Sequence, residues 1–276
     1  MNAGLKQIPR PPPKWLCHKL QCFAEFIKIY TDRNSKHYYL DIFAGSPFYP
    51  CKTNNCTIDV TEISALKNNF LKCIFIVNNS EEAESLASST ESYKKRRQII
   101  TGNCINNNVM RQAFDFIPRS KSILTLIDPV GYTRLRWTTV KKLAAYGTDW
   151  KGHKTDLLIF FPLEMALLRN LTRADCEASI DRLYGNSNWR NIRQDRLDEK
   201  IDHFEAGKAL INLYKKGLKE LDYKYIDDLP PALFSNPPVY HIIWAGDSAN
   251  RKTELDNIWN SPSFLPCELF GKNLQE

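Results

Sequence analysis

Short hydrophobic runs alternate with longer amphipathic stretches along most of this chain. Continuous apolar runs bounded by turn residues are typical of strands buried on both faces, whereas apolar residues spaced three and four apart predict helices. On this basis the sequence predicts strands at 38–43, 73–79, 98–104, 122–131 and from 155 onward, with two more at 223–229 and 238–247. Helical spacing is found at 15–32, 60–70, 81–97, 106–117, 138–146 and 203–221.

Five strand–helix alternations predict parallel βαβ units with right-handed crossovers. The last two strands are separated only by "PPALFSNPP", so one of them, which we place at 239–244, must run antiparallel. The predicted fold class is therefore α/β, a doubly wound, mostly parallel Rossmann-like sheet of the class I methyltransferase type with parallel order 3-2-1-4-5. Residues 1–13 form a Pro-rich leader and residues 14–276 a single domain, with a charged helical insertion at about 172–205.

Charge, hydrophobicity and cysteine content limit the partners and the cellular location that we expect for the protein. The net charge of +7 permits nucleic acid as a partner but does not require it. No apolar run reaches the roughly 18 residues that span a bilayer, and the N-terminal stretch has no apolar signal region, so we expect a cytoplasmic protein without a membrane partner. Its eight cysteines are then expected to be reduced thiols. The Cys17/Cys22 and Cys51/Cys56 spacings allow a zinc site, but the first pair lies in a helical pattern, and we expect no metal.

The ends of the predicted strands carry the candidate chemistry, because open doubly wound sheets bind ligands outside the carboxyl ends of their strands. The first strand contains Asp41 and runs through Phe43 into Ala44-Gly45-Ser46, where small residues let backbone approach a ligand. A carboxylate in a buried strand is costly unless it is paired. Asp41 therefore either orients this loop, receives a cationic ligand, or caps the strand end without any ligand.

The fourth strand ends in Asp128-Pro129-Val130-Gly131. Pro129 holds Asp128 in an extended conformation, and Gly131 permits a tight turn beside a ligand. An ordinary Asp-Pro turn is the alternative interpretation. Together with the first strand end, the pattern favours a site.

Five stretches, in this order along the chain, resemble the successive blocks of the three-Cys-motif partner protein family. They are "KWLCHKLQCFAEFIKIY", "YYLDIFAGSP", "LIDPVGYTRLRWTTVKKLA", "DLLIFFPLEMALLRN" and "PVYHIIWAGDSANRKTELDNIW". The resemblance covers roughly residues 14–260 and implies a protein similar to S-adenosylmethionine-dependent methyltransferases, with a partner protein encoded nearby. It implies that 41–45 form the methionine-side cofactor loop, that the ends of strands two and three hold ribose and adenine, and that 128–131 form the reactive lip.

The chain departs from the methyltransferase pattern at three strand ends. Ser46-Pro47 replaces the second glycine of the first loop, Asn78-Asn79 replaces the ribose acid, and Asn103 replaces an aspartate. Asn makes weaker neutral hydrogen bonds than a carboxylate does. The implied cofactor-binding residues are Asp41, Phe43, Ala44, Gly45, Ser46, Asn78, Asn79 and Asn103, and the implied catalytic residues are Asp128, Pro129 and Gly131.

Two functions therefore remain open. The first is an S-adenosylmethionine-dependent methyltransferase, acting on nucleic acid, with Asp128 orienting or deprotonating the acceptor. The second is a non-catalytic scaffold with a degenerate cofactor site, the partner of an operon-encoded protein. The basic run Tyr93–Gln98 fits phosphate contacts, but a solvated helix end is the favoured interpretation.

Overall fold

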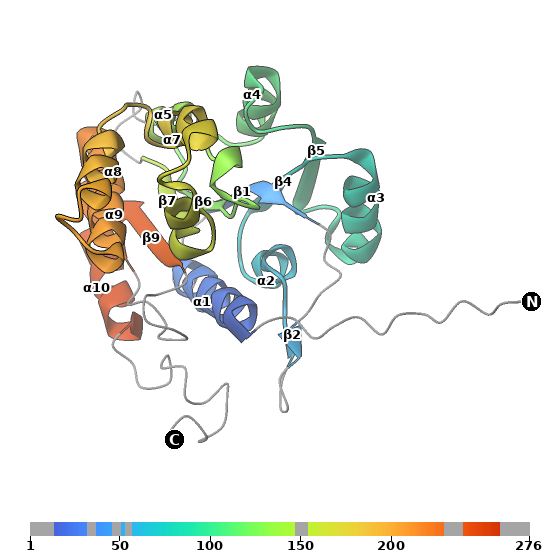
Figure 1. The fold of residues 1–276 in the computed structure, drawn as a ribbon. Helices are drawn as coiled ribbons and strands as arrows, with labels where there is room; N and C mark the ends of the chain where they lie inside the picture. The colour runs from blue at the N-terminus through green and yellow to red at the C-terminus, as the bar shows by residue number, and fades with distance from the viewer. Residues whose placement is uncertain are drawn as a thin grey trace, which may run out of the picture.

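The computed structural model describes residues 14–31, 37–45, 51–52, 57–146, 154–228 and 240–259. Within these residues a seven-stranded sheet has the order β5-β4-β1-β6-β7-β9-β8 (Figure 1). Its strands are β1 (Tyr38–Ala44), β4 (Lys72–Val77), β5 (Arg97–Thr101), β6 (Ile123–Ile127), β7 (Asp156–Phe161), β8 (Tyr225–Asp228) and β9 (His241–Gly246). A separate antiparallel pair consists of β2 (Cys51–Lys52) and β3 (Thr57–Ile58).

The five strands β5, β4, β1, β6 and β7 are parallel, whereas β9 runs antiparallel to both of its neighbours, β7 and β8. This confirms the predicted 3-2-1-4-5 order and the late antiparallel strand. A parallel sheet that reverses only at this penultimate position has the class I methyltransferase topology. Val239, the predicted start of the antiparallel strand, lies outside the described residues.

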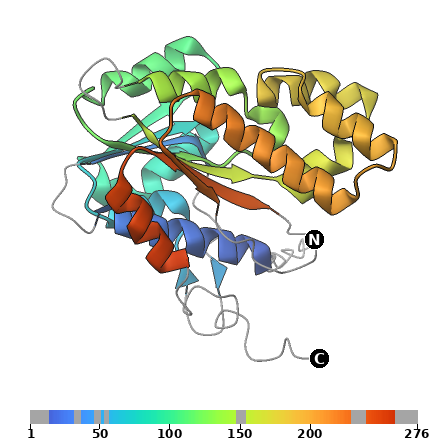
Figure 2. The same ribbon diagram turned by 90° about the vertical axis from the view of Figure 1, so that its left-hand side faces the viewer.

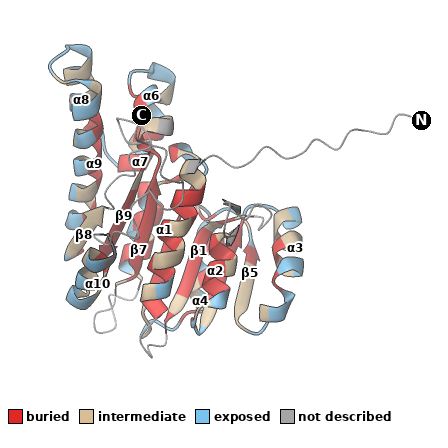
Figure 3. Ribbon diagram, turned by 90° about the horizontal axis from the view of Figure 1, so that it is seen from below, coloured by how far each residue is buried: buried red, intermediate tan, exposed pale blue. Residues whose placement is uncertain are grey.

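Helices cover both faces of the sheet, which explains why its strands read as continuous apolar runs. They are α1 (Lys14–Thr31), α2 (Thr61–Lys67), α3 (Ser80–Ser89), α4 (Asn107–Asp115), α5 (Trp137–Ala145), α6 (Leu168–Asn170), α7 (Glu177–Tyr184), α8 (Trp189–Leu197), α9 (His203–Glu220) and α10 (Ala249–Trp259). One core packs α1, α2, α3 and α10 against the sheet, and a larger core packs α4, α5, α7 and α9 against its other face (Figure 2). The central strands are buried along their length, whereas the outer faces of α3 and α9 are exposed (Figure 3).

The charged segment at 172–205 is helical, with α7 and α8 inside it. Its apolar positions nevertheless contribute to the larger core: Ile180, Leu183 and Trp189 are fully buried. Trp189 donates a hydrogen bond from its indole nitrogen to Asp181 at 2.8 Å, which satisfies the polar atom of a buried ring.

The basic run at 93–98 follows the end of helix α3, with Lys94 and Lys95 exposed as expected of a solvated helix end and Arg96 and Arg97 partly buried. Helix α3 ends at Ser89, and Arg97 already begins β5. Arg96 donates to the backbone oxygen of Asn68 at 2.9 Å, and Arg97 donates to that of Leu86 at 3.3 Å. Arg96 therefore ties the C-terminal end of α2 to strand β5, and Arg97 ties the last turns of α3 to it.

The expectation of reduced thiols is correct for four cysteines and wrong for a fifth. Cys22, Cys73, Cys104 and Cys176 are free, whereas Cys17 is disulfide-bonded. Among the described residues no helix is long and apolar enough to cross a bilayer, and no cluster of His, Cys, Asp or Glu could hold a metal ion.

Candidate functional site

A cleft with a volume of about 100 Å³ opens over the carboxyl ends of β1, β4, β5 and β6. This is the end of the sheet where doubly wound folds bind ligands. The residues that line it come from all four strand ends and from the helices that follow: Ile42, Phe43, Ala44, Gly45, Ile76, Asn78, Glu82, Gly102, Asn103, Cys104, Val130 and Arg134.

Strand β1 reaches the cleft through an irregularity in its pairing with β4. Asp41 pairs with Phe75 and Ala44 with Val77, so the β1 strand contains an extra residue between these two positions. Such a bulge re-aims side chains and is common beside binding sites. Here it leaves Asp41 only 1% exposed beneath the loop while Phe43, Ala44 and Gly45 line the cleft.

Asp41 and Glu62 hold the loop from below. The carboxylate of Asp41 accepts a hydrogen bond from the Phe43 amide at 3.0 Å. The carboxylate of Glu62, from α2, accepts the Gly45 amide at 2.8 Å and the Thr61 hydroxyl at 3.2 Å. The backbone amides of Phe43 and Gly45 are therefore already bonded within the protein, as in the capped strand end that the sequence left open.

Burial makes these two carboxyl groups hard to ionise. Desolvation raises the pKa of Asp41 well above its ordinary value, the neighbouring Glu62 raises it further, and the Phe43 amide opposes the shift. Desolvation likewise raises the pKa of Glu62, against the effect of its bond to the Gly45 amide. Two buried acids that repel each other titrate as a pair, and a cation brought near them would favour their ionised forms.

Asp128 is not a free carboxylate at the lip. Lys19, from α1, donates from Nζ to both of its oxygens, at 2.7 and 3.0 Å. The side chains of this ion pair are only 10% and 19% exposed, and the Lys19 ammonium also lies 4.7 Å from the centre of the Phe160 ring. Lys19 occupies both carboxylate oxygens, so Asp128 is better suited to orient an acceptor than to accept its proton.

The structure brings together most, but not all, of the residues that the sequence singled out. Phe43, Ala44, Gly45, Asn78 and Asn103 line the cleft. Asp41 lies behind it, and Asn79 accepts the Glu82 amide at 2.9 Å as the N-terminal cap of α3, so neither is a lining residue.

The residues of the lip, 128–131, are likewise divided between those that line the cleft and those that do not. Val130 lines the cleft and is 81% exposed, whereas Asp128, Pro129 and Gly131 do not line it. Gly131 has a φ of 84°, which confirms that the turn needs glycine there. Ser46 lies outside the described residues.

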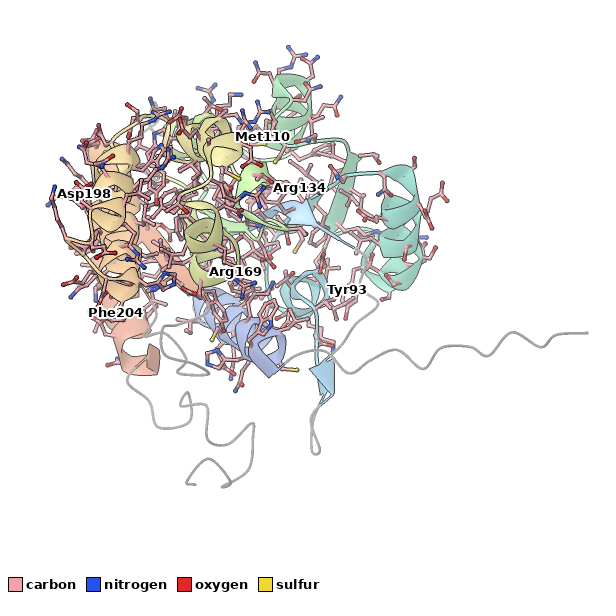
Figure 4. The ribbon with its side chains drawn as sticks, viewed as in Figure 1. Tyr93, Met110, Arg134, Arg169, Asp198 and Phe204 are labelled. Carbon is pink, nitrogen blue, oxygen red and sulfur yellow. The ribbon has the colours of Figure 1, made fainter. Side chains whose placement is uncertain are left out.

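Four residues of the site were missed by sequence reasoning. Lys19 and Glu62 are distant in sequence from their partners, so no local signal could have found them. Glu82 lines the cleft from the first turn of α3. Arg134, labelled in Figure 4, lines it from the turn after β6. An acid four residues beyond the expected ribose position is a signal that a wider search around "VNNSEE" could have found.

At Gly45 the first loop leaves room for a ligand such as S-adenosylmethionine. A Cβ atom placed on Gly45 would meet no atom of the residues that the structure describes within 4 Å, so space lies open among them where a ligand would approach the loop. Asn103 uses its Oδ1 to accept the Ile105 amide at 3.0 Å and retains its NH₂ group as a donor. Cys104 is no nucleophile, because burial raises the pKa of its thiol to about 12.

The sequence matches no protein-family profile and no curated protein. Solved structures resemble it at low identity. Protein LPL1258 from Legionella pneumophila is 9% identical with a TM-score of 0.48, and the match covers 88% of this chain and 91% of that one. TYW2 from M. jannaschii, solved in complex with AdoMet, is 10% identical with a TM-score of 0.42, covering 87% and 77%. The B. subtilis M1A22 tRNA methyltransferase TrmK is 12% identical with a TM-score of 0.38, covering 88% and 70%.

Proposed function

We propose that this protein binds S-adenosylmethionine in the cleft over β1, β4 and β5 and transfers its methyl group to an acceptor at the Asp128 lip. The observation that carries the proposal is the cleft itself, which collects Phe43, Gly45, Asn78 and Asn103 from three successive strand ends of a methyltransferase sheet. The resemblance to the three-Cys-motif partner family supports the same conclusion from the sequence.

When bound, the cofactor supplies an electrophilic methyl group, and the chain's own residues supply position and charge. Asp41 and Glu62 place an acidic pair beneath the loop, which favours a ligand that carries a positive charge. Asp128, fixed by Lys19, offers hydrogen-bond acceptors at the lip. Val130 presents an apolar surface there and Arg134 a cation, which suits a nucleic-acid acceptor with a base and a phosphate.

A non-catalytic scaffold is the second candidate, and two contacts favour it. The Gly45 amide and the Asp128 carboxylate are both satisfied within the protein, by Glu62 and Lys19, so the loop and the lip are stable without a ligand. In that case the same surface would serve the nearby-encoded protein partner that the family resemblance implies.

Gly45→Val separates the two functions. The Cβ of the new side chain meets no atom of the described part of the chain, so the fold should remain intact while the ligand's approach is blocked. S-Adenosylhomocysteine at about 100 times its Kd should stabilise wild type by roughly 2.7 kcal/mol, which raises Tm by roughly 5 to 10 °C.

In Gly45→Val that rise in Tm should vanish, with the Tm of the free protein unchanged. Methyl transfer to RNA or DNA should be lost in the same variant. A wild-type protein that shows neither a Tm shift nor methyl transfer at millimolar cofactor would instead support the scaffold.

A further inference from the structure

The cleft contains one acidic side chain whose role is unexplained. Glu82 lies in the first turn of α3, and its side chain is half-buried at the cleft wall near Asn78 and Gly102. Among the residues that the structure describes, its carboxylate has no hydrogen-bond or ion-pair partner. The neighbouring acids of the site differ in this respect, because Asp41, Glu62 and Asp128 all accept bonds from the protein.

The local backbone fixes where Glu82 stands. Asn79 has an extended conformation directly after β4, and its side chain accepts the Glu82 amide at 2.9 Å. This cap starts α3 immediately at the strand end, so the first helical turn borders the cleft. The position of Glu82 is therefore set by the same Asn79 that occupies the expected place of an acid.

We propose that Glu82 binds the ribose hydroxyls of the cofactor, taking over the role for which Asn78 and Asn79 lack a charge. A carboxylate has only acceptor atoms, and two vicinal hydroxyls are donors that match both of its oxygens. Glu82 lines the cleft together with Asn78 and Asn103, which follow the carboxyl ends of β4 and β5. This inference rests on the proposed function and names one residue within it.

A purely structural role is the competing explanation. An acid in the first turn of a helix stabilises the helix dipole, by about 0.3 to 1 kcal/mol. Glu81 occupies the same turn as Glu82 and is exposed. Glu84, two residues after Glu82, is also exposed and lies outside the cleft. A helix-dipole role predicts no dependence on ligand structure, whereas a ribose role predicts it directly.

The test compares two ligands in two variants by isothermal titration: S-adenosylhomocysteine and its 2′,3′-dideoxy analogue, with Glu82→Gln and the control Glu84→Gln. In Glu82→Gln the affinity for S-adenosylhomocysteine should fall about 10- to 100-fold, because a charge-assisted pair of hydrogen bonds is lost. The affinity for the dideoxy analogue should stay within about twofold of wild type, and Glu84→Gln should match wild type for both ligands.

Three results would overturn the inference. If Glu82→Gln and wild type bind S-adenosylhomocysteine with equal affinity, Glu82 does not bind the ribose, but the proposed cofactor site still stands. An equal loss for both ligands would assign Glu82 to general electrostatics rather than to ribose. No binding of either ligand to wild type would overturn the inference together with the proposed function.

Discussion

The Lys19–Asp128 ion pair joins helix α1 to the lip and should be strongly coupled. Its two N–O distances of 2.7 and 3.0 Å and its low exposure place it between a surface and a buried salt bridge. Removing one partner of a buried pair costs about 3 to 5 kcal/mol. We expect Lys19→Met to destabilise by about 3 kcal/mol, at the lower end because part of the pair is hydrated.

Because of the neighbouring acids, the two single substitutions should differ in how much they lower the free energy of unfolding. Lys19→Met leaves Asp128 beside the raised-pKa pair Asp41 and Glu62, whereas Asp128→Asn removes one of three mutually repelling carboxylates. We expect about 2 kcal/mol for Asp128→Asn and about 3 kcal/mol for the double variant. The coupling energy from this cycle is then about 2 kcal/mol.

Urea denaturation of the four proteins at pH 7 gives these differences from the midpoints and slopes. The exposed ion pair between Lys94 and Glu91, at 2.9 Å, is the matched control, and Lys94→Met should leave the midpoint unchanged. If the effects of Lys19→Met and Asp128→Asn add within about 0.5 kcal/mol, the two side chains are not coupled and the described lip is wrong.

Three further predictions follow from the same structure. Gly102→Ala should destabilise by about 2 kcal/mol, because Gly102 has a φ of 146° and a Cβ there would lie 2.6 Å from Val109; a urea midpoint equal to wild type would contradict this. Burial raises the folded-state pKa of Asp156 to about 6 despite its ion pair with Arg251. The native state therefore holds this proton more tightly than the unfolded state does. The free energy of unfolding of wild type should fall by roughly 3 kcal/mol relative to that of Asp156→Asn as pH rises from about 4 to 6. Urea titrations in which the two proteins show the same pH dependence over this range would contradict this. If the net charge of +7 serves nucleic acid, RNA affinity should fall by orders of magnitude between low and physiological salt, and salt-independent or absent binding would argue for a protein partner.

The sheet was predictable because its signal is local. Each strand is an apolar run closed by turn residues, and the short link before the last strand leaves room only for an antiparallel return. Part of the cleft was predictable for the same reason, since Phe43, Gly45, Asn78 and Asn103 stand at strand ends whatever the packing of the helices.

The electrostatics of the site were not predictable in this way. Lys19 meets Asp128 across 109 residues, and Glu62 meets Gly45 across 17, and both contacts depend on how α1 and α2 pack beside the sheet. The arginines of the basic run show the same limit, because charge in the sequence does not reveal that Arg96 and Arg97 bond to backbone oxygens. Hydrogen bonds and ion pairs between elements far apart in the sequence depend on tertiary packing, so a local sequence motif does not predict them.

The central claim is that the cleft over β1, β4 and β5 holds the cofactor, and calorimetric titration of the wild-type protein with S-adenosylhomocysteine tests it most directly. We expect saturable binding of one ligand per chain, and we expect Gly45→Val to abolish it. We also expect proton release on binding of cationic S-adenosylmethionine, because Asp41 and Glu62 have raised pKa values and ionise beside a cation. No heat of binding at millimolar ligand, or binding that survives in Gly45→Val, would contradict this claim.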